Sequence, residues 1–128
     1  MNKVILDSSA LLALINNEEG SSVVEELLGS IIMSSINISE VASILLDSEM
    51  DTEQVSKAIE PFIDSIIDFD FEYSILCASL KKSTKHLGLS LGDRACISLG
   101  IKLGLPIYTA DKICAEVKLD NIDIRLIR

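Results

Sequence analysis

Short apolar runs alternate with longer segments of helical character along the whole chain. Residues 4–6 and 31–34 are apolar runs of the length expected for strands that are buried on both faces. Residues 90–103 indicate a helix, because Gly104 and Pro106 follow where helices commonly end. The same pattern predicts strands at residues 66–69, 107–109 and 122–127, and helices at residues 10–15, 18–28, 37–47, 51–63, 71–86 and 112–116.

Two of these helices carry polar residues that refine the prediction. Asn37 and Glu40 have the spacing of a helix cap and its third helical residue, so Asn37 is expected to cap the helix that follows. Lys81, Lys82 and Lys85 fall in the last turns of the helix predicted at residues 71–86. There, positive charge interacts favourably with the helix dipole.

Strands that alternate with helices predict an α/β protein. The expected architecture is a three-layer α/β/α sandwich around a mostly parallel central sheet. Residues 1–128 are long enough for one such domain and too short for two domains with separate cores. In this class of fold, ligands bind beyond the carboxyl ends of the strands. The functional residues are therefore sought just after the predicted strands.

Composition restricts the possible binding partners of the protein more than it restricts the fold. The chain is 48% hydrophobic with 4% aromatic residues, which favours an aliphatic core and argues against disorder. Its formal net charge is −9. Proteins that bind nucleic acid usually neutralise phosphates with clustered Lys and Arg, so this charge argues against an extended basic surface. Any contact with nucleic acid is expected to be local or mediated by a metal ion.

The cysteines and the single histidine restrict the chemistry further. Cys77, Cys96 and Cys114 lie far apart and form no Cys-x-x-Cys pair, so we expect reduced, mostly buried thiols without a disulfide or zinc site. His86 is the only histidine and is expected near a helix end. Chemistry that needs two histidines is thereby excluded, and a metal site would consist of oxygen ligands.

The sequence favours a cytoplasmic protein. The apolar segment near the start resembles a signal peptide, but Asp7 interrupts it. No apolar stretch reaches the roughly 20 residues that a membrane-spanning helix needs. We therefore expect no membrane association.

Four acidic residues stand where predicted helices begin, and each has a purely structural interpretation. Asp7 and Asp111 follow predicted strands and could be simple helix caps. Glu40 and Asp93 could be the third residues of capping boxes that Asn37 and Ser90 open. Taken one at a time, capping is the better explanation for each acid.

Taken together, the same four acids predict a metal site. Helix starts and strand ends meet along one edge of a parallel sheet, which would bring the carboxylates close to one another. Like charges at short range repel, and a divalent cation relieves the repulsion. Mg²⁺ or Mn²⁺ suits a site made only of oxygen ligands. Capping does not exclude this role, because a carboxylate can direct one oxygen to a helix and the other to a metal.

Four motifs in the chain resemble those of PIN-domain proteins, and of VapC-like toxins in particular. Residues 88–95 read Gly-Leu-Ser-Leu-Gly-Asp-Arg-Ala, and residues 108–111 read Tyr-Thr-Ala-Asp. Residues 7–10 read Asp-Ser-Ser-Ala, and residues 39–41 read Ser-Glu-Val. The similarity extends over nearly the whole chain, from Val4 to its end.

The resemblance implies a metal-dependent endoribonuclease that cleaves structured RNA with a metal-activated water and is blocked by a cognate antitoxin. It further implies a homodimer. Position by position, it assigns Asp7, Glu40, Asp93 and Asp111 to an acidic quartet that is catalytic and holds Mg²⁺ or Mn²⁺, with Ser8 and Thr109 in support. A fifth acid found in some relatives has no match here, because Lys112 follows the last aspartate.

The roles of two basic residues and three alternative functions of the protein remain open at this point. Arg94 and Lys112 adjoin acids of the quartet and could contact RNA, although Arg94 could equally pair with a neighbouring carboxylate. One alternative function is a non-catalytic PIN-like module that binds RNA or protein. Another is a PIN ribonuclease of RNA processing that has no antitoxin. A phospho-receiver domain fits poorly, because Asp7 is followed by serines rather than by a second acid.

Overall fold

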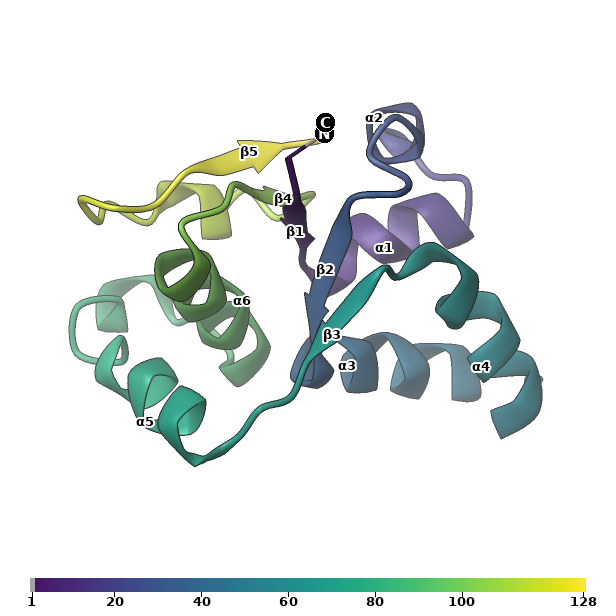
Figure 1. Ribbon diagram of the computed structural model, residues 1–128, viewed down its shortest axis with the longest axis horizontal. Coiled ribbons are helices and arrows are strands. Elements are labelled where there is room, and N and C mark those ends of the chain that lie inside the picture. The colour runs from purple at the N-terminus through teal and green to yellow at the C-terminus, as the bar shows by residue number, and fades with distance from the viewer. Residues whose placement is uncertain (1) are drawn as a thin grey trace.

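Five short strands form one parallel sheet in the order β3-β2-β1-β4-β5. The computed structural model describes residues 2–128, and Figure 1 shows the sheet at the centre of the molecule. Every pairing within the sheet is parallel, and β1 lies between β2 and β4. The strands are β1 (Val4–Leu6), β2 (Ile31–Ser34), β3 (Ser65–Ile67), β4 (Ile107–Thr109) and β5 (Ile124–Leu126).

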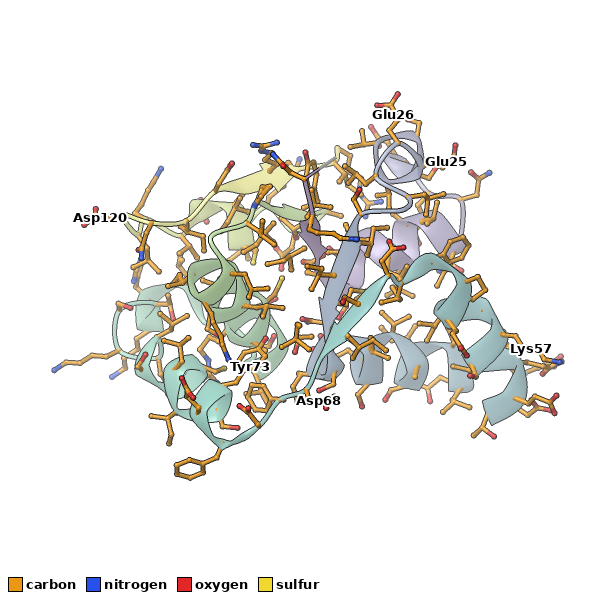
Figure 2. All side chains as sticks on the ribbon, in the orientation of Figure 1. Glu25, Glu26, Lys57, Asp68, Tyr73 and Asp120 are labelled. Atoms are coloured by element: carbon orange, nitrogen blue, oxygen red, sulfur yellow. The ribbon has the colours of Figure 1, made fainter. Side chains whose placement is uncertain are left out.

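Helices cover both faces of this sheet, which confirms the predicted three-layer sandwich. Helices α1 to α4 lie on one face, and α5 and α6 lie on the other (Figure 1). Tyr73 of α5 (Figure 2) links α5 to α6, because its hydroxyl donates a hydrogen bond to the carbonyl oxygen of Ala95 in α6 at 2.5 Å. The helices are α1 (Ser8–Ile15), α2 (Ser21–Glu25), α3 (Ser35–Leu46), α4 (Thr52–Ile59), α5 (Phe71–Ser79) and α6 (Leu91–Leu103), with 3-10 turns at Glu60–Phe62, Lys85–Leu87 and Cys114–Glu116.

The central strands are buried on both faces, as their unbroken apolar sequences predict. Leu6 and Met33 pack against α1, α3 and α4, whereas Ile5 and Ile32 pack against α5 and α6. Successive side chains of a strand point to opposite faces, so three or four apolar residues supply both cores. The three cysteines are free and buried, as expected. Within residues 2–128, no helix is both long enough and apolar enough to cross a membrane.

The predicted cap at Asn37 is wrong. Helix α3 begins two residues earlier, at Ser35, and its cap is Ser34, whose hydroxyl accepts a hydrogen bond from the backbone N–H of Ile36. Strand β2 therefore passes directly into α3 without a loop. This places Asn37 inside the helix, where it is 1% exposed.

Helix α5 is also shorter than predicted, since it ends at Ser79 rather than near residue 86. After Ser79 the backbone changes to hydrogen bonds between residues three apart, since the N–H groups of Leu80 and Lys81 donate to the carbonyl oxygens of Cys77 and Ala78. Lys81, Lys82 and Lys85 consequently lie beyond the helix, in the connection to α6. The proposed dipole role of these lysines is therefore incorrect. His86 lies in the 3-10 turn of this connection.

Candidate active site

All four acids that the sequence singled out line one cleft at the carboxyl edge of the sheet. Asp7 directly follows β1, and Asp111 lies two residues after β4. Glu40 comes from α3, and Asp93 comes from the first turn of α6. This acidic cleft has a volume of about 200 Å³, and its lining residues are Asp7, Ser8, Ser9, Leu12, Asn37, Glu40, Ile44, Asp93 and Asp111.

Asp7 is the most buried of the four acids, at 4% exposure. It caps α1, because its Oδ1 accepts a hydrogen bond from the backbone N–H of Ala10 at 3.0 Å. Burial raises the pKa of the Asp7 carboxyl, and the nearby Asp93 raises it further, while hydrogen bonds from Thr109, Ala10 and Ser9 act in the opposite direction. The predicted cap is thus confirmed, but capping leaves the high cost of ionising this buried group unexplained.

Two hydroxyl groups fix both oxygens of the Asp7 carboxylate. Thr109 Oγ1 donates to Asp7 Oδ2, and Ser9 Oγ donates to Asp7 Oδ1 at 2.7 Å. Thr109 is fully buried and also accepts a hydrogen bond from the backbone N–H of Asp111, so it links two of the acids. The resemblance pointed to Thr109 but not to Ser9. The sequence offers adjacent serines after β1, and only the fold shows which of them faces Asp7.

Glu40 is held by two side chains from different helices. Its Oε1 accepts hydrogen bonds from Ser8 Oγ and from Asn37 Nδ2, the latter at 3.0 Å. Asn37 Nδ2 also lies 3.1 Å from the carbonyl oxygen of Gly92, which ties α3 to α6. Asn37 Oδ1 is buried and has no hydrogen-bond partner within residues 2–128. Sequence reasoning assigned Asn37 to a cap and missed this positioning role.

Gly92 lets Glu40 approach α6 closely. A Cβ atom at position 92 would lie only 2.1 Å from Glu40 Oε2, far inside the contact distance of the two atoms. Glu40 therefore occupies the space that any side chain at position 92 would need. The glycine that precedes Asp93 in the motif at residues 88–95 is thus explained by the placement of an acid from another helix.

Asp93 and Asp111 each use one oxygen for a local backbone bond. Asp93 Oδ2 accepts from the N–H of Ser90 at 3.0 Å, and Ser90 Oγ accepts from the N–H of Asp93, which confirms the predicted capping box. Asp111 Oδ1 accepts from the N–H of Ile113 at 2.9 Å. Within residues 2–128, Asp93 Oδ1, Asp111 Oδ2 and Glu40 Oε2 make no hydrogen bond. Three acids therefore bind the protein through one oxygen and keep the other available.

These available oxygens fit a hard divalent cation in their chemistry, since Mg²⁺ and Mn²⁺ prefer carboxylate oxygens. The spacing of the acids is less favourable. Across residues 2–128, no group of three or more His, Cys, Asp or Glu side chains is arranged so that it could hold a metal ion as it stands. The donor set fits the ion, and a bound ion would require the carboxylates to draw together.

The two basic residues beside the acids make no ion pair with them. Arg94 is half-buried and Lys112 is exposed, and neither lines the acidic cleft. Over the described part of the chain, the ion pairs are Lys57–Glu53, Arg125–Asp123 and Arg128–Glu18. The alternative in which Arg94 pairs with a neighbouring carboxylate is therefore not observed.

The raised pKa of Asp7 predicts how stability depends on pH. The carboxyl ionises near pH 3.8 in the unfolded chain and at higher pH in the fold, so the folded state holds this proton more tightly. In metal-free buffer, the wild type should lose free energy of unfolding relative to Asp7→Asn as pH rises from about 4, by roughly 1.4 kcal/mol for each unit of pKa elevation. Urea denaturation with EDTA from about pH 4 to pH 7 measures this difference, and parallel curves for the two proteins would contradict it.

Comparisons with known proteins agree with the fold. The sequence profile described as the PIN domain matches residues 4–119. No curated protein sequence matches the chain significantly.

Solved structures give close matches in fold at low sequence identity. A chain of the DNA-bound VapBC from Salmonella typhimurium matches with a TM-score of 0.75 and 18% identity, over 100% of both chains. A chain of VapBC2 from Rickettsia felis, bound to a promoter DNA fragment, has a TM-score of 0.73 and 20% identity over 98% of both chains. A chain of VapBC-5 from Mycobacterium tuberculosis, a member of the VapBC family of toxin-antitoxin systems, has a TM-score of 0.66 and 16% identity, over 95% of this chain and 96% of that one.

Proposed function

Because this chain belongs to the PIN domain family, we propose that it is a metal-dependent endoribonuclease and the toxin of a toxin–antitoxin pair. The convergence of four carboxylates from four separate segments in one cleft is the observation that carries the proposal. Capping alone would not require it, because Glu40 lies in the middle of α3 and caps nothing. The nearly complete overlap in fold with chains of VapBC complexes supports the toxin assignment.

The roles of the residues follow from their contacts. Asp7, Glu40, Asp93 and Asp111 would hold Mg²⁺ or Mn²⁺. When bound, the ion orients a water, lowers its pKa and stabilises the charge that develops on the scissile phosphate. Ser9 and Thr109 fix the orientation of Asp7, and Ser8 and Asn37 fix that of Glu40. Such supporting contacts hold ligands in place before the substrate arrives.

The proposed partners are structured RNA, an antitoxin and a second copy of the chain. The antitoxin is inferred from the toxin–antitoxin complexes that share this fold. The homodimer is supported by exposed apolar side chains on α5, where Phe71 is 81% exposed and Ile75 is 56% exposed. Exposed apolar surface of this kind commonly marks a protein interface.

A non-catalytic PIN-like module that binds RNA or protein is the second candidate. The observation in its favour is that no three acidic side chains within residues 2–128 stand close enough to hold a metal ion as placed. A PIN ribonuclease of RNA processing without an antitoxin would share the chemistry and differ only in its partner. A test of metal binding distinguishes the non-catalytic module from the toxin nuclease and from the RNA-processing nuclease.

Binding of metal should stabilise the protein. Mg²⁺ or Mn²⁺ at a concentration about 100 times its Kd is expected to add about 2.7 kcal/mol to the free energy of unfolding, because the ion binds only the folded site. Glu40→Gln should blunt this gain, since glutamine keeps an oxygen for Ser8 and Asn37 but removes the charge. Thermal denaturation over a metal titration measures both effects. The same gain in wild type and variant would argue against Glu40 as a ligand.

A further inference from the structure

A second, smaller hollow lies on the connection between α5 and α6. Its volume is about 120 Å³, well below that of the pockets that enclose whole small molecules. The residues that line this basic hollow are Lys81, Thr84, Lys85, Gly88, Leu89 and Arg94. Three of them are positively charged, and no acidic residue of the described chain contributes to the lining.

The charges of the basic hollow are not neutralised by the protein. Lys81, Lys85 and Arg94 take part in none of the ion pairs found within residues 2–128. Acidic residues outnumber basic ones by 20 to 11 in this chain, so three unpaired cations around one hollow depart from the overall charge. Confined like charges repel one another, and a bound anion would relieve that repulsion.

The hollow adjoins the acidic cleft through the first turn of α6. Arg94 lines the hollow, and its neighbour Asp93 lines the cleft. An extended polyanion that passes over this turn would meet the two sites in succession. The cleft itself repels a phosphate until a cation is bound, so the hollow provides the positive charge that the cleft lacks.

We propose that the basic hollow binds one backbone phosphate of the RNA substrate, on a nucleotide other than the one that is cut. This inference rests on the proposed function and extends it to how the RNA is held. A contact to phosphate fixes the position of RNA without reading its sequence, so the hollow sets the register of the strand over the acidic cleft. Lys81 and Lys85 are exposed and would meet the phosphate from solvent, while Arg94, which lines the hollow from α6, is half-buried.

The proposal is tested by the salt dependence of RNA binding. The test variant is the double substitution Lys81→Gln and Lys85→Gln. The control is Lys3→Gln with Lys57→Gln, which removes the same charge elsewhere and breaks only the exposed ion pair between Lys57 and Glu53. Lys3 precedes β1 at the opposite edge of the sheet, and Lys57 projects from α4 on the far side of the molecule from α5 (Figure 2).

Binding is measured with labelled bulk tRNA in EDTA, which withholds the metal that hydrolysis would need. For the wild type and the control, the logarithm of affinity should fall with the same slope against the logarithm of salt concentration. For the test variant the slope should be shallower by about 1, and affinity at low salt should fall several-fold. Cleavage of the same RNA by each protein is measured separately in Mg²⁺ or Mn²⁺.

The outcomes separate this proposal from the proposed function. Wild type that cleaves RNA, with equal slopes for test and control variants, would overturn the phosphate site alone. A slope change specific to the test variant, without cleavage by the wild type, would support the phosphate site and contradict the nuclease. Wild type that neither binds nor cleaves RNA would overturn both.

Discussion

Asp93→Asn is expected to lower the rate of metal-dependent RNA cleavage by at least about a hundredfold, while the free energy of unfolding changes by less than about 1 kcal/mol. Asparagine has nearly the same shape as aspartate and keeps an oxygen that can accept from the N–H of Ser90. The capping box of α6 would therefore survive. The negative charge at the acidic cleft would be lost, and with it one ligand of the proposed cation. Cleavage kinetics and urea denaturation of the same preparation measure the two effects.

Ser90→Ala is the matched control for this prediction. It removes the hydroxyl that accepts from the N–H of Asp93 but keeps the carboxylate. Loss of a helix cap of this kind typically costs about 1 kcal/mol. The control should therefore lose more stability than Asp93→Asn and far less activity. If Ser90→Ala abolished cleavage as completely as Asp93→Asn, the contribution of Asp93 would be explained by capping, and the metal-ligand role would be wrong.

Gly92→Ala should reduce cleavage at least tenfold by displacing an acid that belongs to a different helix. The added Cβ would meet Glu40 Oε2 at 2.1 Å, so the Glu40 side chain must move away from α6. Because the clash involves the end of a flexible side chain, the backbone can stay in place. Alanine also favours a helix by up to about 1 kcal/mol relative to glycine, which offsets part of the cost. We therefore expect lost activity with little change in the thermal midpoint.

Gly100→Ala provides the contrasting result on the same helix. A Cβ at position 100 would lie 2.5 Å from Cδ1 of Ile107, a fully buried residue of β4. Overpacking a core of this kind typically costs about 1–3 kcal/mol. This variant should lose stability and keep its activity at temperatures where it remains folded.

For Gly92→Ala, full activity would contradict the prediction, because it would show that the position of Glu40 in the cleft does not matter for catalysis.

The fold could be predicted because its signals are local. The apolar runs at β1, β2 and β4 are buried on both faces, and the helix starts at Asp7 and Ser90 follow the expected capping rules. The parallel topology then follows from the alternation of strands and helices. It also places Asp7 and Asp111 at the same edge, so the convergence of acids was a consequence of topology rather than of any single motif.

The wrong prediction for Asn37 and the missed role of Ser9 both concern contacts between segments that are distant in the sequence. Asn37 satisfies the sequence rule for a cap, but the polar end of β2 supplies Ser34 first, and Asn37 is then enclosed by Ser8, Glu40 and Gly92. Ser9 likewise faces Asp7 and the backbone of Ala110, a partner about 100 positions away in the chain. Spacing within a sequence carries no information about such neighbours.

The end of α5 illustrates a different limit. Apolar positions continue at helical spacing past Ser79, yet the helix ends there, because the backbone N–H groups of Leu80 and Lys81 bond to carbonyl oxygens three residues back. Hydrophobic periodicity does not show this change in backbone hydrogen bonding, and it predicted a longer helix. Lys81 and Lys85, which were expected on a helix, line the basic hollow instead.

Cleavage of end-labelled tRNA and ribosomal RNA by the purified protein tests the nuclease assignment. We expect discrete fragments in Mg²⁺ or Mn²⁺, none in EDTA, and none with Asp7→Asn, which keeps the Oδ1 bonds to Ser9 and Ala10 but lacks the charge. Uncut RNA, together with no metal bound to the wild type in a direct titration, would contradict the nuclease assignment and favour the non-catalytic module.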